Sequence, residues 1–303
     1  MISEAVVQAL KSFVPEENIY IQEPMAKHTT FRIGGPADYF VQPESEEQLM
    51  RIRQYLDKVE LPWFILGNGS NLLVSDAGFP GVILQVGHRM NRISVEGCKI
   101  RAQAGATLAQ VAKTALDNGL TGFEFAAGIP GTVGGGVVMN AGAYGGEMKQ
   151  VVETVTVLDK QCGRMEIRNC DMEFGYRTSA VKNRNFTVTE VLFSLTEGNP
   201  EEIKALMDDL ASRRREKQPL EYPSAGSTFK RPEGYFAGKL IMDAGLQGFQ
   251  IGGAKVSDKH CGFVINACEA TAEDVRNVIR HVQEQVKEKF GVSLETEVMF
   301  LGF

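Results

Sequence analysis

Apolar residues recur every three or four positions in four stretches of the chain, which is the spacing of one buried helix face. The stretches follow residues that commonly cap helices, namely Ser3, Ser45, Thr107 and Thr271, and a fifth helix is predicted from its start signals at Asn199. Ser45 and Gln48 form an S-x-x-Q capping box, and Pro200 is typical of a first helical position. A shorter helix is predicted at residues 237–244, before Gly245. The pattern therefore predicts six helices spread over the whole chain.

Apolar or alternating runs predict the strands. Strand, helix and strand within residues 39–66 predict a βαβ unit, and another strand is expected at residues 82–86. After residue 92 the strands alternate, with a hairpin around Glu96 and Gly97 and antiparallel strands at residues 151–158 and 186–195. A closing strand is predicted at residues 292–300, with Glu295 and Glu297 on one face. We expect a parallel first lobe and a mixed or antiparallel second lobe.

Residues 122–146 form the most glycine-rich part of the chain and include the run Gly134-Gly135-Gly136. Such a run fits a backbone that offers N–H groups to a bound cofactor, or a tight packing crossover between elements. The loop at residues 67–71, GNGSN, directly follows a predicted strand, where α/β proteins bind ligands. Neither stretch has the P-loop or Rossmann fingerprint. We therefore predict a cofactor site of another kind.

Further candidate loops lie at residues 222–231 and 251–255. Between the second lobe and these loops, the helix after Asn199 ends in Arg213-Arg214-Arg215. This basic cluster is either a phosphate site or a set of cations at the negative end of a helix dipole. Pro219 and Pro223 mark the expected start of the third domain's own loops.

Composition narrows the class of protein. The chain has 303 residues, of which 43% are hydrophobic and 23% charged, as in ordinary globular proteins. A net charge of -6 argues against nucleic acid as a partner, and no apolar run is long enough for a membrane helix. The first residues do not look like a signal peptide, and the five cysteines include no C-x-x-C pair, which favours free thiols in a reducing cytoplasm. The four histidines show no metal-ligand spacing, so we expect no metal.

Six motifs in one order resemble a known family. They lie at residues 29–38 (TTFRIGGPAD), 67–73 (GNGSNLL), 122–142, 175–179 (GYRTS), 225–229 (AGSTF) and 295–298 (ETEV). Over nearly the whole chain they resemble UDP-N-acetylenolpyruvoylglucosamine reductases, also called UDP-N-acetylmuramate dehydrogenases, which are flavoenzymes of bacterial peptidoglycan precursor synthesis. The part from Lys230 to Glu297 is too compact for the tyrosine loop of longer members. The chain therefore resembles the short form, in which another segment must cover the substrate.

The resemblance implies an α+β fold, with a two-lobed FAD-binding domain of the vanillyl-alcohol oxidase/PCMH type and a C-terminal α+β substrate-binding domain. The implied domains are residues 1–86, 87–198 and 199–303. It also implies non-covalent FAD, NADPH as hydride donor and the enolpyruvyl ether of UDP-N-acetylglucosamine as substrate. We expect a cytoplasmic monomer that binds neither membranes nor nucleic acid.

The family register implies three catalytic residues. Arg177 would bind the substrate carboxylate through its planar fork, although it could instead pair structurally with Glu173 or another acid. Glu297, when protonated, would donate a hydrogen bond to the enolate-like intermediate, and only the register selects it over Glu295. Ser227 would donate the proton to carbon, whereas its position alone suggests a turn residue.

The resemblance also implies residues that contact the cofactor and the substrates. The residues expected to bind FAD are Arg32, Gly34, Gly67, Asn68, Gly69, Ser70, Asn71, Gly128, Pro130, Gly131, Gly134, Gly135, Asn140, Ala141 and Gly142. Lys239 and Asn266 are expected at the substrate or NADPH. Two other functions stay open at this stage: a flavin-dependent oxidase of the same fold, and a non-enzymatic UDP-sugar-binding protein.

Overall fold

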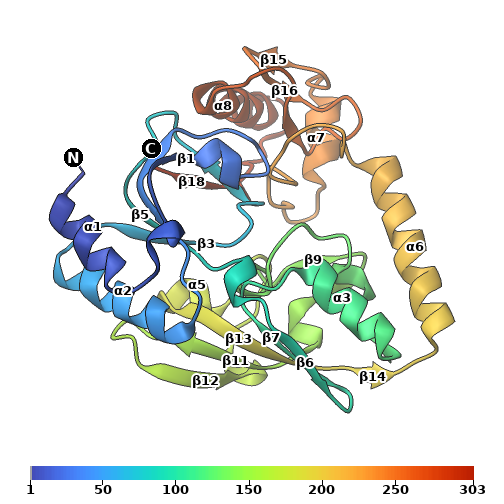
Figure 1. Cartoon of the computed structure of the whole chain (residues 1–303). Helices are drawn as coiled ribbons and strands as arrows, with labels where there is room; N and C mark the ends of the chain where they lie inside the picture. Colours follow the sequence, from blue (N-terminus) through green and yellow to red (C-terminus); the bar gives the residue numbers. More distant parts are fainter. Residues whose placement is uncertain (1) are drawn as a thin grey trace. The chain divides into compact units, whose positions relative to one another are not determined.

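The computed structural model describes residues 2–303 and divides the chain into two compact units (Figure 1). The first unit contains the segment up to Ile21, Tyr39–Asn68 and Gly81–Arg214. The second contains Gln22–Asp38, Gly69–Pro80 and Arg215–Phe303. Each unit is therefore assembled from segments that are far apart in the sequence, and each has its own cluster of buried apolar side chains.

The two N-terminal helices begin where the sequence predicted, but only Ser45 forms a side-chain cap and the predicted capping box is not completed. Helix α1 (Glu4–Lys11) begins after Ser3, although the Ser3 side chain makes no cap hydrogen bond. In α2 (Glu46–Lys58) the Ser45 hydroxyl accepts a hydrogen bond from the Gln48 amide at 3.2 Å. The Gln48 side chain reaches back one residue further than a capping box requires and accepts from the backbone N–H of Glu44 at 2.8 Å.

A four-stranded sheet accompanies these helices. Its order is β1 (Ile19–Pro24), β2 (Pro36–Val41), β5 (Phe79–Gln85) and β3 (Trp63–Leu66). Strand β5 lies between the two strands of the predicted βαβ unit and pairs with β3 in parallel, with Trp63 opposite Val82. The apolar runs that predicted these strands supply buried side chains, such as Val82, Ile83 and Leu84.

The second sheet confirms the predicted antiparallel part. Its order is β12 (Arg164–Arg168), β11 (Val152–Leu158), β13 (Thr187–Ser194), β7 (Lys99–Gln103) and β6 (Ile93–Glu96), and all of its pairings are antiparallel. The hairpin around Glu96 and Gly97 joins β6 to β7 as expected. Helix α3 (Leu108–Asp117) has the predicted cap at Thr107, which forms a full capping box with Gln110.

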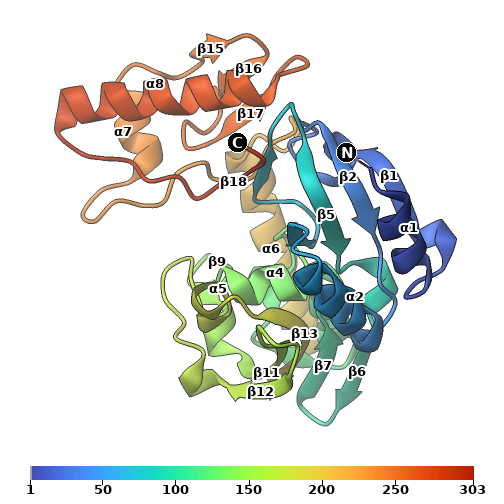
Figure 2. The same ribbon diagram turned by 90° about the vertical axis from the view of Figure 1, so that its left-hand side faces the viewer.

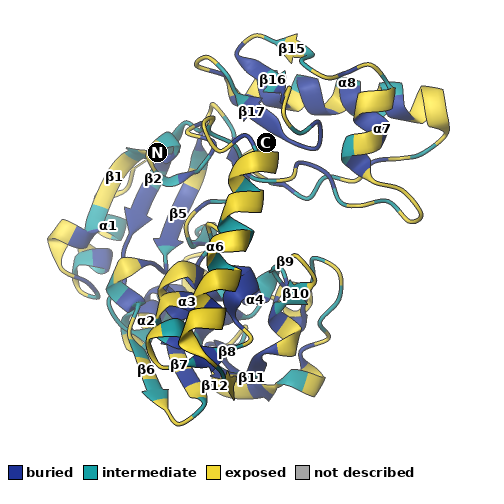
Figure 3. Cartoon of the chain, turned by 90° about the vertical axis from the view of Figure 1, so that its right-hand side faces the viewer, coloured by how far each residue is buried: buried dark blue, intermediate teal, exposed yellow. Residues whose placement is uncertain are grey.

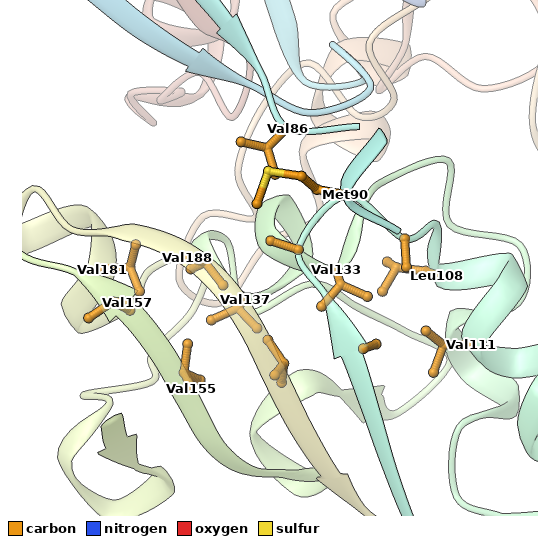
Figure 4. Packing of buried hydrophobic residues seen from close by; sticks show 14 of the residues in the cluster. Val86, Met90, Leu108, Val111, Val133, Val137, Val155, Val157, Val181 and Val188 are labelled. Carbon is orange, nitrogen blue, oxygen red and sulfur yellow. The ribbon is translucent and has the colours of Figure 1, made fainter. Parts of the chain in front are cut away.

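The run of three glycines lies in a helix, α4 (Val133–Val138), and not in an open loop as expected. The physical reason is close packing. A Cβ on Gly134 would lie 3.1 Å from the Cβ of Ala104, and one on Gly136 would lie 3.3 Å from Leu108. Val133 and Val137 of α4 point among Leu108, Val155 and Val188 in the core of the first unit (Figure 4). Glycine is disfavoured in helices, so the tertiary contacts stabilise this one.

Short elements complete the first unit. They are β8 (Leu120–Thr121), β9 (Gly142–Ala143), β10 (Gly146–Glu147), α5 (Ala180–Arg184) and β14 (Thr196–Glu197). Strand β14 pairs with β8, and β9 pairs with β10 in a small hairpin. Short 3-10 helices lie at Glu16–Asn18, Met25–His28, His88–Met90, Glu124–Ala126, Met148–Gln150 and Asn169–Asp171.

Helix α6 (Pro200–Lys217) leads from the first unit into the second part of the chain, and its side chains are mostly exposed (Figure 3). Among its residues only Ile203 is buried. The helix begins at Pro200 with Glu201 and Glu202 in its first turn, as the sequence predicted. Along residues 2–303, no helix is both long and apolar enough to cross a membrane.

The second unit is built around α8 (Ala272–Phe290), seen along its length in Figure 2. It packs with α7 (Ala237–Asp243) and with a sheet of β15 (Gln250–Ile251), β16 (Ala254–Val256) and β17 (Val264–Asn266). Helix α8 begins at the predicted cap Thr271, which forms a capping box with Asp274, and ends at Gly291. Phe31, Ile33 and Leu73 from early in the chain complete its core.

The closing strand is much shorter than predicted. Strand β18 (Met299–Leu301) pairs in parallel with β4 (Leu72–Val74), whereas residues 292–298 form no continuous strand. Those residues make only single hydrogen bonds to the loop around Ser227, from Lys230 N to Glu295 O and from Glu297 N to Thr228 O. A strand needs a continuous ladder with a neighbour, and this loop does not provide one.

Candidate active site

Ser227 lies in an irregular loop of the second unit whose next residue is firmly held. Thr228 is fully buried, whereas Ser227 is exposed. The Thr228 amide donates to the carbonyl of Gly262 at 2.8 Å, and its hydroxyl accepts from the Val264 amide at 2.9 Å. Its carbonyl accepts from the Glu297 amide at 2.9 Å. The backbone beside Ser227 is therefore fixed on three sides, and the Ser227 side chain stays at the surface.

The last of these hydrogen bonds brings the backbone of Glu297 beside this loop. The carbonyl of Glu297 also accepts from the side-chain amide of Asn71 at 3.0 Å, and the Met299 amide donates to the Asn71 carbonyl at 3.0 Å. The backbone of Glu297 is thus held between the Ser227 loop and the loop at residues 67–71. The structure brings together three segments that the sequence only placed in separate motifs.

Glu295 and Glu297 differ in ways that the sequence pattern did not show. Glu295 is exposed, and its carboxylate pairs with the ammonium group of Lys230 at 3.0 Å. Glu297 is half-buried. Of the two carboxyl groups, the better shielded is therefore that of Glu297, whose backbone is bonded to the residue after Ser227.

Arg177 belongs to the first unit and lies in a loop that is hydrogen-bonded to the glycine-rich stretch. The Asn140 side-chain amide donates to the Gly175 carbonyl at 3.0 Å, and the Ser179 hydroxyl donates to the Val138 carbonyl at 3.0 Å. A nitrogen of Arg177 lies 3.5 Å from the Gly142 carbonyl, and its guanidinium lies 5.1 Å from the ring centre of Tyr176. The acid suggested as a structural partner, Glu173, forms an ion pair with Arg184.

Backbone strain accompanies this loop. Arg177 has φ +56°, Asn140 φ +42° and Tyr144 φ +54°, which are left-handed conformations uncommon for residues other than glycine. Each costs free energy unless the surroundings hold it, and such residues cluster at functional sites. Asn140 is buried, and its side chain holds the strain by bonding to Glu147, Gly175 and Lys149.

The backbone N–H groups of the three glycines do not offer the donor set that the sequence suggested. The amides of Gly134, Gly135 and Gly136 donate to the Ala104 carbonyl, the Thr132 hydroxyl and the Thr132 carbonyl, at 2.8–3.3 Å. Gly135 is different because it is exposed, and a Cβ there would meet only the Thr132 hydroxyl at 3.5 Å. Packing therefore explains Gly134 and Gly136, while Gly135 leaves an open face that a cofactor could approach closely.

In the loop at residues 67–71, two glycines lie very close to other parts of the chain. A Cβ on Gly67 would lie 2.4 Å from the hydroxyl of Thr132, the N-cap of α4. Gly69 has φ +60°, and a Cβ on it would lie 2.1 Å from the carbonyl of His28. Both glycines are required for the loop to lie where it does, so the exposed Asn68 is presented by a rigid backbone.

The arginine cluster at the end of α6 separates into different environments. Arg213 pairs with Asp209 at 2.8 Å on the helix surface. Arg214 packs against Gly128, where a Cβ would lie 3.2 Å from its side chain, and burial lowers the pKa of its guanidinium. Arg214 is therefore the half-buried member of this pair of arginines, in the last turn of α6. Its position beside the glycine-rich stretch could not be inferred from the sequence.

The other predicted residues have mainly structural contacts. The side-chain amide of Asn266 donates to the Phe31 carbonyl at 3.2 Å, and its oxygen accepts from the Ala270 amide at 2.9 Å. Lys239 pairs with Asp243 at 2.5 Å on the surface of α7. Arg32 is exposed, with φ +55°.

Metal and disulfide chemistry find no support in the described residues. Within residues 2–303, no three His, Cys, Asp or Glu side chains are grouped so that they could hold a metal. All five cysteines are free, and burial raises the pKa of the Cys162 and Cys261 thiols.

Comparison with known proteins now identifies the family. Residues 218–301 match the family model described as UDP-N-acetylenolpyruvoylglucosamine reductase, C-terminal domain, and residues 37–167 match an FAD-binding domain. A UDP-N-acetylenolpyruvoylglucosamine reductase of Caldanaerobacter subterraneus subsp. tengcongensis is 54% identical over 301 residues, 99% of both chains. This chain belongs to the UDP-N-acetylenolpyruvoylglucosamine reductase family. The reductase of Clostridium perfringens strain SM101 agrees, with 53% identity over 97% of this chain and 96% of its own.

Solved structures with a similar fold include another member of this family. The reductase from Thermus caldophilus matches with a TM-score of 0.81 and 34% identity, covering 93% of this chain and 99% of its own. An alkyldihydroxyacetonephosphate synthase matches with a TM-score of 0.51 and 17% identity over 64% of this chain and 41% of its own, which shows a shared fold alone. The predicted fold class, with its vanillyl-alcohol oxidase/PCMH-type FAD-binding domain, is confirmed, and FAD is the cofactor.

Proposed function

We propose that this chain reduces the enolpyruvyl ether of UDP-N-acetylglucosamine to the lactyl ether of UDP-N-acetylmuramate, using NADPH as hydride donor. As a member of its family it is an FAD-containing oxidoreductase of peptidoglycan precursor synthesis. The observation that carries the proposal is the hydrogen bond from the Glu297 amide to the Thr228 carbonyl, at 2.9 Å. It joins the backbones of the AGSTF and ETEV motifs, which supports a shared role for Ser227 and the half-buried Glu297.

The proposed roles follow from the charge that develops in the reaction. The chemistry supplied by bound FAD is transfer of a hydride, taken from NADPH, to the methylene carbon of the enolpyruvyl group. The neighbouring carbon then carries negative charge that spreads into the carboxylate. Ser227 donates its hydroxyl proton to that carbon and regains a proton from water. Arg177 binds the carboxylate, and Glu297 in its protonated form donates a hydrogen bond to the same charge.

In this proposal the loop at residues 67–71 and the surface around Gly135 hold the cofactor, and Gly128, Pro130 and Gly131 are further contacts. The support is the set of close backbone approaches at Gly67 and Gly69 and the open face of Gly135. Arg32, Gly34 and residues 140–142 are proposed as further FAD contacts, and Lys239 and Asn266 as contacts to substrate or NADPH. We also propose FAD-binding lobes at residues 1–86 and 87–198, a substrate-binding domain at 199–303, and a cytoplasmic monomer.

The two half-reactions give a direct test of the role of Ser227. Reduction of FAD by NADPH requires no proton donor to carbon, so Ser227→Ala should leave it nearly unchanged. Reoxidation by the enolpyruvyl substrate should slow by roughly 10² to 10⁴, the contribution typical of a general acid. Stopped-flow absorbance of the flavin measures both steps on one sample.

Ser227→Cys is the matched variant because it keeps a transferable proton. It should recover part of the reoxidation rate that the alanine variant loses. If Ser227→Ala reoxidises at the wild-type rate, or slows only the NADPH step, Ser227 is not the proton donor.

A further inference from the structure

His260 lies in the loop between β16 and β17, and its ring takes part in the local backbone hydrogen bonding. Its Nδ1 accepts a hydrogen bond from the Gly262 amide at 3.1 Å. An acceptor nitrogen carries no proton, so the neutral ring holds its proton on Nε2. The His260 amide donates a hydrogen bond to the Ser257 hydroxyl at 3.3 Å, and the His260 carbonyl accepts one from the Phe263 amide at 2.9 Å. The ring and the backbone around it therefore form one tight turn.

This turn is connected directly to the loop of Ser227. The carbonyl of Gly262 accepts from the amide of Thr228 at 2.8 Å. That amide belongs to the peptide group that joins Ser227 to Thr228. One residue, Gly262, thus donates to the His260 ring and accepts from the peptide group after Ser227. The orientation of the ring and the position of Ser227 depend on the same short segment.

The ring is packed so that it keeps this orientation. It stands edge-on to the ring of Phe263, with 5.0 Å between ring centres. A Cβ on Gly262 would lie 2.9 Å from Cε1 of His260, and one on Gly238 of α7 would lie 3.3 Å from the same atom. Burial lowers the pKa of His260, which keeps the ring neutral around pH 7.

We propose that His260, in its neutral form with Nδ1 as acceptor, is a positioning residue that holds Ser227 through Gly262 and Thr228. This inference rests on the proposed role of Ser227. When the ring is protonated, Nδ1 becomes a donor and opposes the Gly262 amide, so the turn that anchors Thr228 loses a hydrogen bond. Proton donation from Ser227 should then become slower in acid.

Other charged groups near the ring already have partners. On its own loop, Asp258 pairs with Lys255 at 2.5 Å, and Lys259 bonds to the Arg215 carbonyl at 2.7 Å. The packed segments contribute Lys239, which pairs with Asp243, and Lys230, which pairs with Glu295. The Cys261 thiol, next in sequence, is neutral at low pH because burial raises its pKa. Protonation of His260 is thus the titration that disturbs the Gly262 hydrogen bond directly.

Two variants separate the two nitrogens of the ring. The side-chain oxygen of asparagine can take the place of Nδ1 and accept from the amide two residues on, as in an Asx turn. Glutamine reaches the place of Nε2 and puts no acceptor at Nδ1. His260→Asn should therefore reoxidise its flavin at close to the wild-type rate, whereas His260→Gln should be slower by roughly tenfold, as for one lost hydrogen bond.

The pH profile of substrate-driven reoxidation distinguishes positioning from simple packing. The wild-type rate should fall below the lowered pKa of His260, and His260→Asn should lack this acid limb because it has no titrating ring. The rate of flavin reduction by NADPH, measured on the same samples, should show neither effect. An acid limb that persists unchanged in His260→Asn would overturn the proposal.

A measurement independent of turnover is the ¹⁵N NMR spectrum of the histidine ring in the FAD-bound protein. At neutral pH the Nδ1 signal of His260 should be that of an unprotonated nitrogen, and a protonated Nδ1 would overturn the assignment even if His260→Gln failed to fold. The outcomes also separate the two proposals. If Ser227→Ala reoxidises its flavin at the wild-type rate, Ser227 is not the proton donor. If Ser227→Ala is slow but His260→Gln reoxidises at the wild-type rate, only the positioning role of His260 is wrong.

Discussion

Arg177 combines a permanent positive charge with a strained backbone. Its φ of +56° is maintained by a loop that Asn140 holds through the Gly175 carbonyl, at 3.0 Å. Lysine would keep the charge but not the planar fork that binds a carboxylate through two parallel hydrogen bonds. The residue type and the held loop together suit a preorganised anion site.

We expect Arg177→Lys to lower turnover by roughly 10² to 10³, the effect of removing one main transition-state donor. Steady-state kinetics with NADPH and the enolpyruvyl substrate measures it. The control is Arg184→Lys, because Arg184 lies nearby on α5 and forms its ion pair with Glu173 on the surface. That control should keep wild-type turnover, and an Arg177→Lys variant that also kept it would show a structural arginine.

At the scale of single elements, α4 has one glycine, Gly136, that packs in the core and another, Gly135, that faces the proposed cofactor site. A side chain at Gly136 would press on Leu108 and Met148 at 3.3 Å, and so would disturb the core. A side chain at Gly135 would point to an open face, with only the Thr132 hydroxyl at 3.5 Å. A side chain at Gly135 should therefore block the proposed cofactor face without disturbing the core, whereas one at Gly136 should disturb it.

Gly135→Leu should fold normally and bind FAD weakly or not at all, because its side chain occupies the face that the cofactor is proposed to approach. The ratio of flavin absorbance to protein absorbance measures binding, and far-UV circular dichroism measures folding. Gly135→Ala is a smaller step and should keep part of the flavin. A folded leucine variant with full FAD content would show that the cofactor does not approach α4.

Helix α8 depends on charge at its N-terminus. The carboxylate of Asp274 accepts from the amides of Thr271 at 3.0 Å and Gly253 at 3.2 Å, and these bonds lower the pKa of Asp274. Since the folded-state pKa lies below the unfolded one, the contribution to stability is complete above about pH 4 and is lost as the pH falls through the folded value.

Asp274→Asn should lower the free energy of unfolding by about 0.5–1 kcal/mol at neutral pH, as for a weakened cap with its dipole interaction. The difference from wild type should shrink as the pH falls below about 4 and should vanish below the lowered folded-state pKa, where the wild-type carboxyl is also neutral. Urea unfolding followed by circular dichroism is suitable, because the only tryptophan, Trp63, lies in the first unit. A difference that stays constant with pH would contradict the ionic contribution.

At the scale of the whole molecule, the second unit is assembled from distant segments. Its core includes Phe31, Ile33 and Leu73, its strand β18 pairs with β4, and the Asp76 carboxylate accepts from the Ala272 and Glu273 amides at the start of α8. A fragment of residues 215–303 lacks all of these partners. The C-terminal segment is therefore an incomplete folding unit.

We expect residues 215–303 alone to show residual helix but no cooperative unfolding, because part of the core and the only partner of β18 are missing. Circular dichroism during a urea titration tests this, with the full chain as the reference. A sharp transition, together with well-dispersed NMR signals, would mean that the early segments are dispensable.

The sequence alone determined the features that depend on neighbours along the chain. Caps and apolar periodicity predicted α3 and α8, which both begin at the expected residue, and the turn at Glu96 and Gly97 predicted its hairpin. These signals are local, since a cap bonds to an amide three residues away and a helix face repeats every few residues. The motif register also singled out Arg177, Ser227 and Glu297 as candidates.

Only the tertiary structure decided the features that depend on distant partners. The three glycines lie in a helix whose packing against Ala104 and Leu108 leaves little room for side chains at Gly134 and Gly136. The closing strand begins at Met299 because β4 offers a ladder only from there. Glu297 lies beside Ser227, and His260 is linked to it through Gly262, by hydrogen bonds between segments more than thirty residues apart. Such contacts depend on how the segments pack in space, and local sequence patterns carry no information about that.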